Sequence, residues 1–175
     1  MFSSRDKHPG RQIPGEVGIL ITIKDLSMEY DGRKVLSEVN LDIPRSTITA
    51  IVGPSGSGKT TLLRLIDLLE EPTFGMVLHN GFDINRNENR RSIEIRRRIG
   101  MVLQRPVLFN GDVGHNVAYG LKVRGQKGND VDTKVLKALH SVGLEGYEKK
   151  NSNTLSGGEI QRVAIARALV TEPEL

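Results

Sequence analysis

The chain has 175 residues, of which 37% are hydrophobic and 26% charged, and this size and composition predict a single globular domain. It contains no cysteine, which excludes disulfides and cysteine-rich metal sites. The 25 basic and 21 acidic residues give a formal charge of +4, which suits a phosphate-bearing ligand but is also ordinary for a protein surface.

Residues 1–18 are polar and rich in glycine and proline, and they lack the apolar stretch of a secretory signal. Elsewhere, no apolar run approaches the ~18 residues that a membrane-spanning helix needs. We therefore expect a flexible tail over residues 1–18 and one domain over residues 19–175. The protein is expected to be cytosolic and to reach a membrane only through a partner.

The first part of this domain is rich in strand signals. Residues 19–24 alternate between apolar and polar positions, and residues 35–43 form a second strand pattern after a turn at Asp31 and Gly32. Residues 47–52 are apolar and β-branched, which predicts a short strand buried on both faces.

Helices become frequent further along the chain. The first is predicted directly after the glycine-rich residues 53–58, and it ends before Pro72; its apolar side chains share one face and are Leu62, Leu65, Ile66 and Leu69. Further strands are predicted over residues 75–78 and 100–103, and further helices over residues 88–99, 131–142 and 159–170. This order of elements predicts an α/β protein.

The glycine-rich loop over residues 53–60 matches the pattern G-x-x-x-x-G-K-[ST] at every fixed position. Glycines let the backbone curl round phosphate oxygens with its N–H groups pointing inward at a helix N-terminus. Lys59 can reach the outer phosphates, and the Thr60 hydroxyl can bind Mg²⁺. An accidental glycine-rich turn is the alternative, but this pattern arises by chance in ~1% of chains of this length. The loop therefore predicts a nucleotide site, of a kind that kinases, GTPases, helicases and transporters share.

A second pair of glycines, Gly157 and Gly158, precedes the last predicted helix. Ser156 and Glu159 flank the pair in the S-x-x-E pattern of a capping box, which is a purely structural feature. Two consecutive glycines are nevertheless unfavourable in a helix, and they leave backbone N–H groups open to an anion at its start. Two such helix ends in one chain indicate two partial sites that a second copy completes.

The sequence LSGGEIQR at residues 155–162, together with GPSGSGKTT at residues 53–61, resembles the ATP-binding cassette (ABC) ATPases, and the resemblance covers residues 19–175. It implies a P-loop NTPase core with an antiparallel β subdomain and a helical subdomain, incomplete at the C-terminus. It also implies that ATP and Mg²⁺ bind between two chains arranged head to tail. The residues implied to hold the nucleotide are Gly53, Pro54, Ser55, Gly56, Ser57, Gly58, Lys59, Thr60 and Thr61 of one chain and Ser156, Gly157 and Gly158 of the other.

Two further positions match the family. Tyr30 stands where the family places an aromatic ring against adenine, although on its own it reads as an ordinary core or surface tyrosine. Gln104 stands where the family has a catalytic glutamine that contacts Mg²⁺ and the attacking water. The chain departs from the family at residues 45–47, which replace the usual Gly-Glu, and at Glu159, where glutamine is commoner and glutamate is associated with importers.

The carboxylates that the family uses for hydrolysis lie on an apolar strand ending in Asp-Glu, soon after the signature helix. Residues 1–175 contain no such segment, and no histidine stands at the family's switch position; the four histidines are His8, His79, His115 and His140. We therefore expect this stretch alone to be nearly inactive: it should bind nucleotide poorly, hydrolyse it negligibly and aggregate through an unpaired sheet edge. A truncated chain is the simplest interpretation.

The resemblance implies the ATPase subunit of a transporter, peripheral on the cytoplasmic face of the cell membrane, with permease subunits and a substrate-binding protein as partners. Residues 98–109 and 116–121 look most like importers of oxyanions such as tungstate, molybdate or phosphate. A cassette acting in DNA repair, on chromosomes or on the ribosome is one alternative, and a fragment with no function of its own is another. The basic residues 86–98 lack interleaved aromatics, so no nucleic-acid partner is expected.

Overall fold

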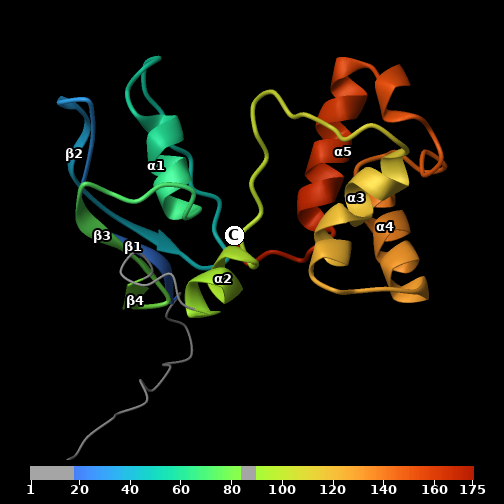
Figure 1. The fold of residues 1–175 in the computed structure, drawn as a ribbon. Coiled ribbons are helices and arrows are strands. Elements are labelled where there is room, and N and C mark those ends of the chain that lie inside the picture. Colours follow the sequence, from blue (N-terminus) through green and yellow to red (C-terminus); the bar gives the residue numbers. More distant parts are fainter. Residues whose placement is uncertain (1–17, 84–89) are drawn as a thin grey trace, which may run out of the picture. The chain divides into compact units, whose positions relative to one another are not determined.

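A computed structural model of the chain describes residues 18–83 and 90–175. The chain divides into two compact units, Met1–Asn87 and Glu88–Leu175. The first contains the strands and one helix, and the second is helical (Figure 1). The tail predicted at the start of the chain lies outside the described residues except for Gly18, whose carbonyl accepts a hydrogen bond of 2.8 Å from Arg45 N.

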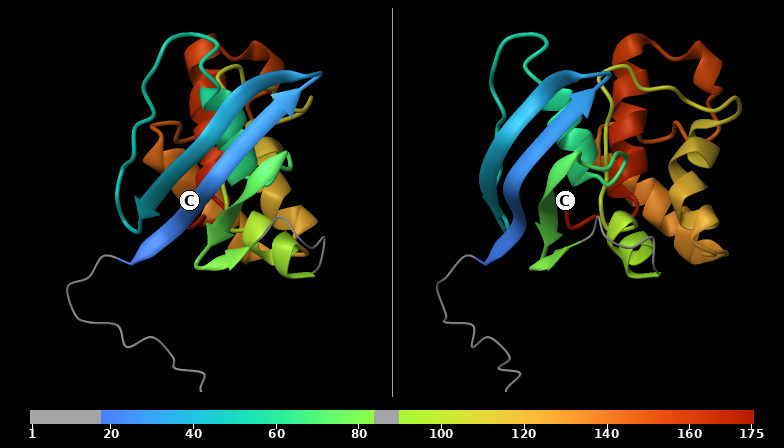
Figure 2. Two further views of the ribbon diagram at one scale, coloured as in Figure 1. Left: turned by 90° about the vertical axis from the view of Figure 1, so that its left-hand side faces the viewer. Right: turned by 60° about the vertical axis from the view of Figure 1, so that its left-hand side comes forward.

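The first unit is built on a four-stranded antiparallel sheet with the order β2-β1-β3-β4. Its two long strands form a hairpin and run side by side (Figure 2). The strands predicted over residues 19–24, 35–43 and 75–78 are confirmed; the observed strands are β1 (Ile19–Tyr30), β2 (Arg33–Pro44), β3 (Phe74–His79) and β4 (Phe82–Asp83).

Helix α1 (Lys59–Ile66) follows the glycine-rich loop, as predicted. Leu62, Leu65 and Ile66 of the expected apolar face are buried. The helix ends earlier than predicted, because the backbone turns left-handed at Leu68 (φ 58°) and a right-handed helix cannot continue through that conformation. Leu69 is consequently 57% exposed instead of completing the apolar face.

The buried strand predicted over residues 47–52 is not formed. These residues make no strand pairing, and both Ile48 and Val52 are almost completely exposed. A strand buried on both faces needs hydrogen-bonding neighbours and cover on either side. Within residues 18–83, the sheet is antiparallel and none of its strands pairs with this segment. The local pattern alone therefore does not make a strand.

The second unit contains the helices α2 (Arg90–Arg96), α3 (Val113–Val123), α4 (Asn129–Ser141) and α5 (Gly157–Leu169), with a short 3₁₀ turn η1 (Ser152–Thr154) before α5. The helices predicted over residues 131–142 and 159–170 are confirmed. The one predicted over residues 88–99 is observed as α2, and its first two residues lie outside the described residues. The strand predicted over residues 100–103 is absent from this unit.

The core of the second unit joins three helices. Val113, Val117 and Leu121 of α3 are almost completely buried, and they belong to one apolar cluster with residues of α4 and α5. Helix α3 was not predicted, because Gly114 and Gly120 lower its helix propensity. Packing of its apolar face outweighs that cost.

The antiparallel sheet and the helical unit agree with the α/β fold class that the sequence predicts. No helix in the described part of the chain combines the length and apolar character that crossing a membrane requires.

Candidate nucleotide-binding sites

The glycine-rich loop of the first unit turns through two left-handed glycines, Gly56 (φ 79°) and Gly58 (φ 85°). Gly58 is also tightly enclosed, since a Cβ there would lie 2.7 Å from Leu36 Cδ2 and 2.9 Å from the Val35 carbonyl oxygen. Both the backbone angle and the neighbouring β2 strand therefore require glycine at this position. The turn directs the chain from the loop into α1.

The side chain of Lys59 folds back into the loop. Its ammonium group donates hydrogen bonds to the carbonyl oxygens of Gly53 (2.8 Å) and Pro54 (2.6 Å), and to Ser57 Oγ (3.3 Å). A flexible lysine held by three neutral acceptors can exchange them for phosphate oxygens, which are stronger partners for a cation. The loop thus places one positive charge at the N-terminus of α1.

The start of α1 is an anion-binding end. Its N-cap residue, Gly58, provides no side-chain hydrogen bond, and the first helical bond runs from Leu62 N to Gly58 O at 2.8 Å. The N–H groups of Lys59, Thr60 and Thr61 therefore have no partner within the helix. Free N–H groups and the helix dipole both favour a phosphate at this point.

The same helix start fits Mg²⁺ as a nucleotide-bound ion. Magnesium commonly takes one or two protein oxygens and completes its shell with phosphate oxygens and water. Thr60 is exposed and offers one such hydroxyl oxygen beside the loop. Nowhere in residues 18–83 or 90–175 do three or more His, Cys, Asp or Glu side chains gather as they would to hold a metal without a nucleotide.

Tyr30 ends β1 and lies beside α1. Its hydroxyl donates a hydrogen bond to the carboxylate of Glu70, which also pairs with Arg64 at 3.1 Å. The bond to Glu70 is the main reason that the pKa of Tyr30 is raised, and the Thr61 side chain acts in the opposite direction. Tyr30 therefore stands next to the last residue of the loop motif. Glu70 was not singled out from the sequence, since it is 40 residues away from its partner.

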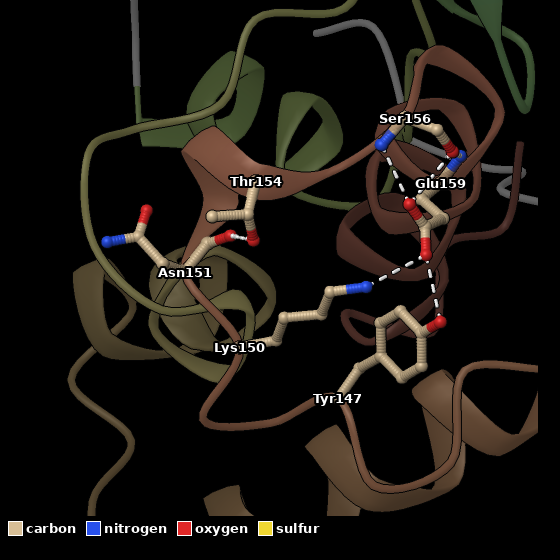
Figure 3. A network of polar contacts seen from close by, with 6 residues as sticks. All are labelled: Tyr147, Lys150, Asn151, Thr154, Ser156 and Glu159. Carbon is tan, nitrogen blue, oxygen red and sulfur yellow. Dashed lines mark hydrogen bonds and ion pairs between the residues drawn. The ribbon is translucent and has the colours of Figure 1, made fainter.

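The second unit carries the other glycine motif. Ser156 is the N-cap of α5, and it forms the predicted capping box with Glu159. Glu159 Oε2 accepts hydrogen bonds from Ser156 N (2.7 Å) and Ser156 Oγ (2.8 Å), as Figure 3 shows. No heavy atom would crowd a Cβ at Gly157, so the backbone at the start of this helix is open to an approaching group.

Two residues that the sequence analysis did not identify complete this cluster. Glu159 Oε1 accepts hydrogen bonds from the Tyr147 hydroxyl (2.8 Å) and from Lys150 Nζ (3.0 Å), on the side of the carboxylate away from Ser156 (Figure 3). All four hydrogen bonds to the Glu159 carboxylate lower its pKa, to about 2, and the bond from the Ser156 backbone N–H has the largest effect. Glu159 is consequently ionised at neutral pH.

Gln104 also belongs to the second unit. It is exposed in the connection between α2 and α3. The predicted site residues are therefore divided between the units: the loop and Tyr30 in the first, and Gln104 and the Ser156–Gly158 motif in the second.

A glycine loop that ends in Lys-Thr at the start of a helix, in an α/β fold, defines a P-loop protein. The family model described as ABC transporter matches residues 36–175. The chain belongs to the ABC transporter family.

Similar proteins include importers with different cargoes. The chain is 42% identical over 163 residues to the phosphate import ATP-binding protein PstB 2 of Natronomonas pharaonis, an alignment that covers 88% of this chain and 57% of that protein. It is 40% identical over 161 residues to the spermidine/putrescine import ATP-binding protein PotA of Acetivibrio thermocellus, covering 91% and 44%. The chain thus spans about half the length of these curated relatives.

The fold is also similar to solved cassettes. The dimeric structure of the bacterial ABC transporter cassette MJ0796 matches with a TM-score of 0.81 and 34% identity, over 88% of this chain and 71% of that one. A second structure of MJ0796, in a post-hydrolysis state bound to ADP and Pi, has a TM-score of 0.78 over the same shares. These matches confirm the predicted fold class, and the chain corresponds to a part of each solved cassette.

Proposed function

We propose that this chain is the ATP-binding part of an ABC transporter, with ATP and Mg²⁺ bound at the loop that ends in Lys59 and Thr60. The observation that supports this proposal is the geometry of that loop. Lys59 Nζ lies within 2.6–3.3 Å of three loop oxygens, directly at a helix end whose first N–H groups lack helical partners. A terminal phosphate would meet a cation and several N–H donors together.

The proposal includes a second copy of the chain. Lys59 and the start of α1 offer one half of a phosphate site, and Ser156, Gly157 and Gly158 offer another half on a separate helix. A head-to-tail pair would place the second half of one chain against the nucleotide of the other. The dimeric structure of the similar cassette MJ0796 supports the pairing of two such chains.

We propose import as the transport direction and an inorganic oxyanion as the cargo, with Gln104 acting at the Mg²⁺ and the attacking water. The 42% identity to the phosphate importer supports the oxyanion, whereas the 40% identity to a polyamine importer supports import without favouring this cargo. Permease subunits and a substrate-binding protein would be partners, with the chain on the cytoplasmic face of the membrane.

The nucleotide site is tested by an NMR titration of the chain with ATP and Mg²⁺, which detects even weak binding. We expect the amide signals of Gly56, Gly58 and Lys59 to shift. The Lys59→Ala variant should bind at least about tenfold more weakly, because it loses a charge-assisted hydrogen bond to phosphate.

Lys34→Ala is the matched control, since it removes an equal charge from exposed β2 in the same unit. Its affinity should equal that of the unmodified chain. The proposed nucleotide site would be refuted if ATP did not shift the amide signals of the loop, or if the Lys59→Ala and unmodified chains bound ATP with equal affinity.

A further inference from the structure

The connection between α4 and α5 presents two side chains to the signature motif. Tyr147 and Lys150 both donate to Glu159 Oε1, and Lys150 Nζ also lies 4.2 Å from the centroid of the Tyr147 ring. The cation therefore interacts with the ring and the carboxylate at once. None of these contacts is needed for the capping box itself, which uses Glu159 Oε2.

All four strong acceptor positions of the Glu159 carboxylate are used. Each oxygen accepts two hydrogen bonds, one oxygen from the backbone and hydroxyl of Ser156 and the other from Tyr147 and Lys150. A glutamine here would turn its NH₂ group either toward the Ser156 N–H or toward the Lys150 ammonium, and both are donors. The surroundings thus account for the glutamate found where the family more often has glutamine.

The backbone around Lys150 is firmly held. Its carbonyl accepts a hydrogen bond of 3.0 Å from the N–H of Val113, which is fully buried at the start of α3. The neighbouring Glu148 carbonyl accepts from Gly114 N at 2.8 Å. Two bonds to a core helix therefore fix the position from which Lys150 reaches Glu159.

This arrangement resolves an electrostatic conflict. A carboxylate in the first turn stabilises a helix, but its negative charge opposes any phosphate that approaches the same helix end. Lys150 supplies a positive charge 3.0 Å from the carboxylate and offsets it. Glu159 can then orient Ser156 without repelling an anion from Gly157 and Gly158.

We propose that Lys150 and Tyr147 are positioning residues for the anion-binding start of α5. Acting through Glu159, they fix Ser156 and offset the carboxylate charge, so that the terminal phosphate of a nucleotide on a second copy of the chain can approach. This inference rests on the proposed function, because the second copy and its nucleotide belong to that proposal.

The test is the association of the full chain with itself in ATP and Mg²⁺, measured by analytical ultracentrifugation. Lys150→Met keeps the aliphatic stem but removes the charge, and it should weaken ATP-dependent association about five- to tenfold at low salt. Lys149→Met is the matched control, since the exposed neighbour carries the same charge without contacting Glu159. Its association should equal that of the unmodified chain.

A second variant separates positioning from simple loss of structure. In Lys150→Met/Glu159→Gln, the amide oxygen can accept both Ser156 hydrogen bonds, and the NH₂ group can donate to the Tyr147 hydroxyl. Neither charge remains near the helix end, so association should return to within about twofold of the unmodified chain. Such a recovery would assign the loss in Lys150→Met to the uncompensated charge of Glu159 and not to the missing lysine side chain.

The loop amides, followed by NMR in the same samples, report on the proposed function separately. If ATP leaves them unmoved in the unmodified chain, the proposed function fails and this inference falls with it. If they respond but ATP-dependent association is absent, the second copy in the proposed function fails and this inference falls with it. If both are observed, three results would overturn the inference alone: equal association of Lys150→Met, an equal loss in Lys149→Met, or no recovery in the double variant.

Discussion

The side chain of Asn116 holds the backbone of Phe109 from both sides. Asn116 Oδ1 accepts a hydrogen bond of 2.7 Å from Phe109 N, and Nδ2 donates one of 2.9 Å to Phe109 O. Asn116 is fully buried, and Ser152 Oγ donates to the same Phe109 carbonyl at 2.9 Å. One amide on α3 therefore pins the long connection that precedes this helix.

Replacing that amide should destabilise the helical unit. Asn116→Leu leaves the N–H of Phe109 without its partner and removes the bond to the Phe109 carbonyl, so we expect a loss of about 2–4 kcal/mol in the free energy of unfolding. Urea denaturation followed by circular dichroism measures it. Asn153→Ala is the control on an exposed side chain of the same unit and should change stability by less than about 0.5 kcal/mol. Equal stability of the two variants would contradict this account.

The two left-handed glycines of the phosphate loop should respond differently to alanine. Gly56→Ala meets no neighbour within 4 Å, so it should cost only the roughly 1–2 kcal/mol of a left-handed alanine. Gly58→Ala adds a methyl group 2.7 Å from Leu36 Cδ2 and 2.9 Å from a backbone oxygen, and it should cost clearly more. The difference in thermal midpoint between these variants is the measurement. Midpoints that agree within error would show that β2 does not restrict the loop.

A partly buried carboxylate should give the sheet unit an unusual dependence on pH. Desolvation raises the pKa of Asp67, at the end of α1, to about 6. The folded state then holds its proton over a pH range in which the unfolded state, with an ordinary pKa of about 3.9, has lost it. The contribution of Asp67 to stability is therefore present below about pH 4 and is lost as pH rises through about 6.

Asp67→Asn should remove this dependence. The variant should be more stable than the unmodified chain at pH 7.5 and nearly equal to it at pH 3.5, as judged by denaturant midpoints at both values. Asp42→Asn, on an exposed position of β2, controls for the change in net charge. A gain at pH 7.5 that is the same in both variants would assign the effect to overall charge.

The sequence predicted best the features whose chemistry lies close together in the chain. The loop over residues 53–60 and the capping box of Ser156 and Glu159 are each complete within eight residues, and each forms locally as expected. The pairing of Tyr30 with Glu70 spans 40 residues, and no local pattern indicates it. The strand predicted over residues 47–52 is wrong for the same reason, because strand formation depends on partners elsewhere and not on apolar content alone.

Within the second motif, the sequence showed the helix cap but not what surrounds it. Lys150 lies nine residues before Glu159, a separation that no regular helix or strand would bring together. The 3₁₀ turn at Ser152–Thr154 lies between them. Only the fold of this connection turns an isolated lysine into the partner of the signature glutamate.

Residues 1–175 alone should turn over ATP far more slowly than about 1 s⁻¹, the slow end of typical enzymes. Hydrolysis needs an acidic group that holds Mg²⁺ or orients water close to the phosphates. Lys59 bonds only carbonyl and hydroxyl oxygens, and Asp67 lies at the opposite end of α1, about 12 Å along an eight-residue helix. Glu70 is already held by Tyr30 and Arg64.

A steady-state phosphate-release assay on the purified stretch measures this rate. Lys59→Ala is the background control, since it removes the cation that would hold the phosphates and reveals any contaminating ATPase. Turnover near 1 s⁻¹ that disappears in Lys59→Ala would show that a group within residues 1–175 activates water. A rate equal to that of the Lys59→Ala variant agrees with a loop that binds the phosphates but has no carboxylate beside it to activate water.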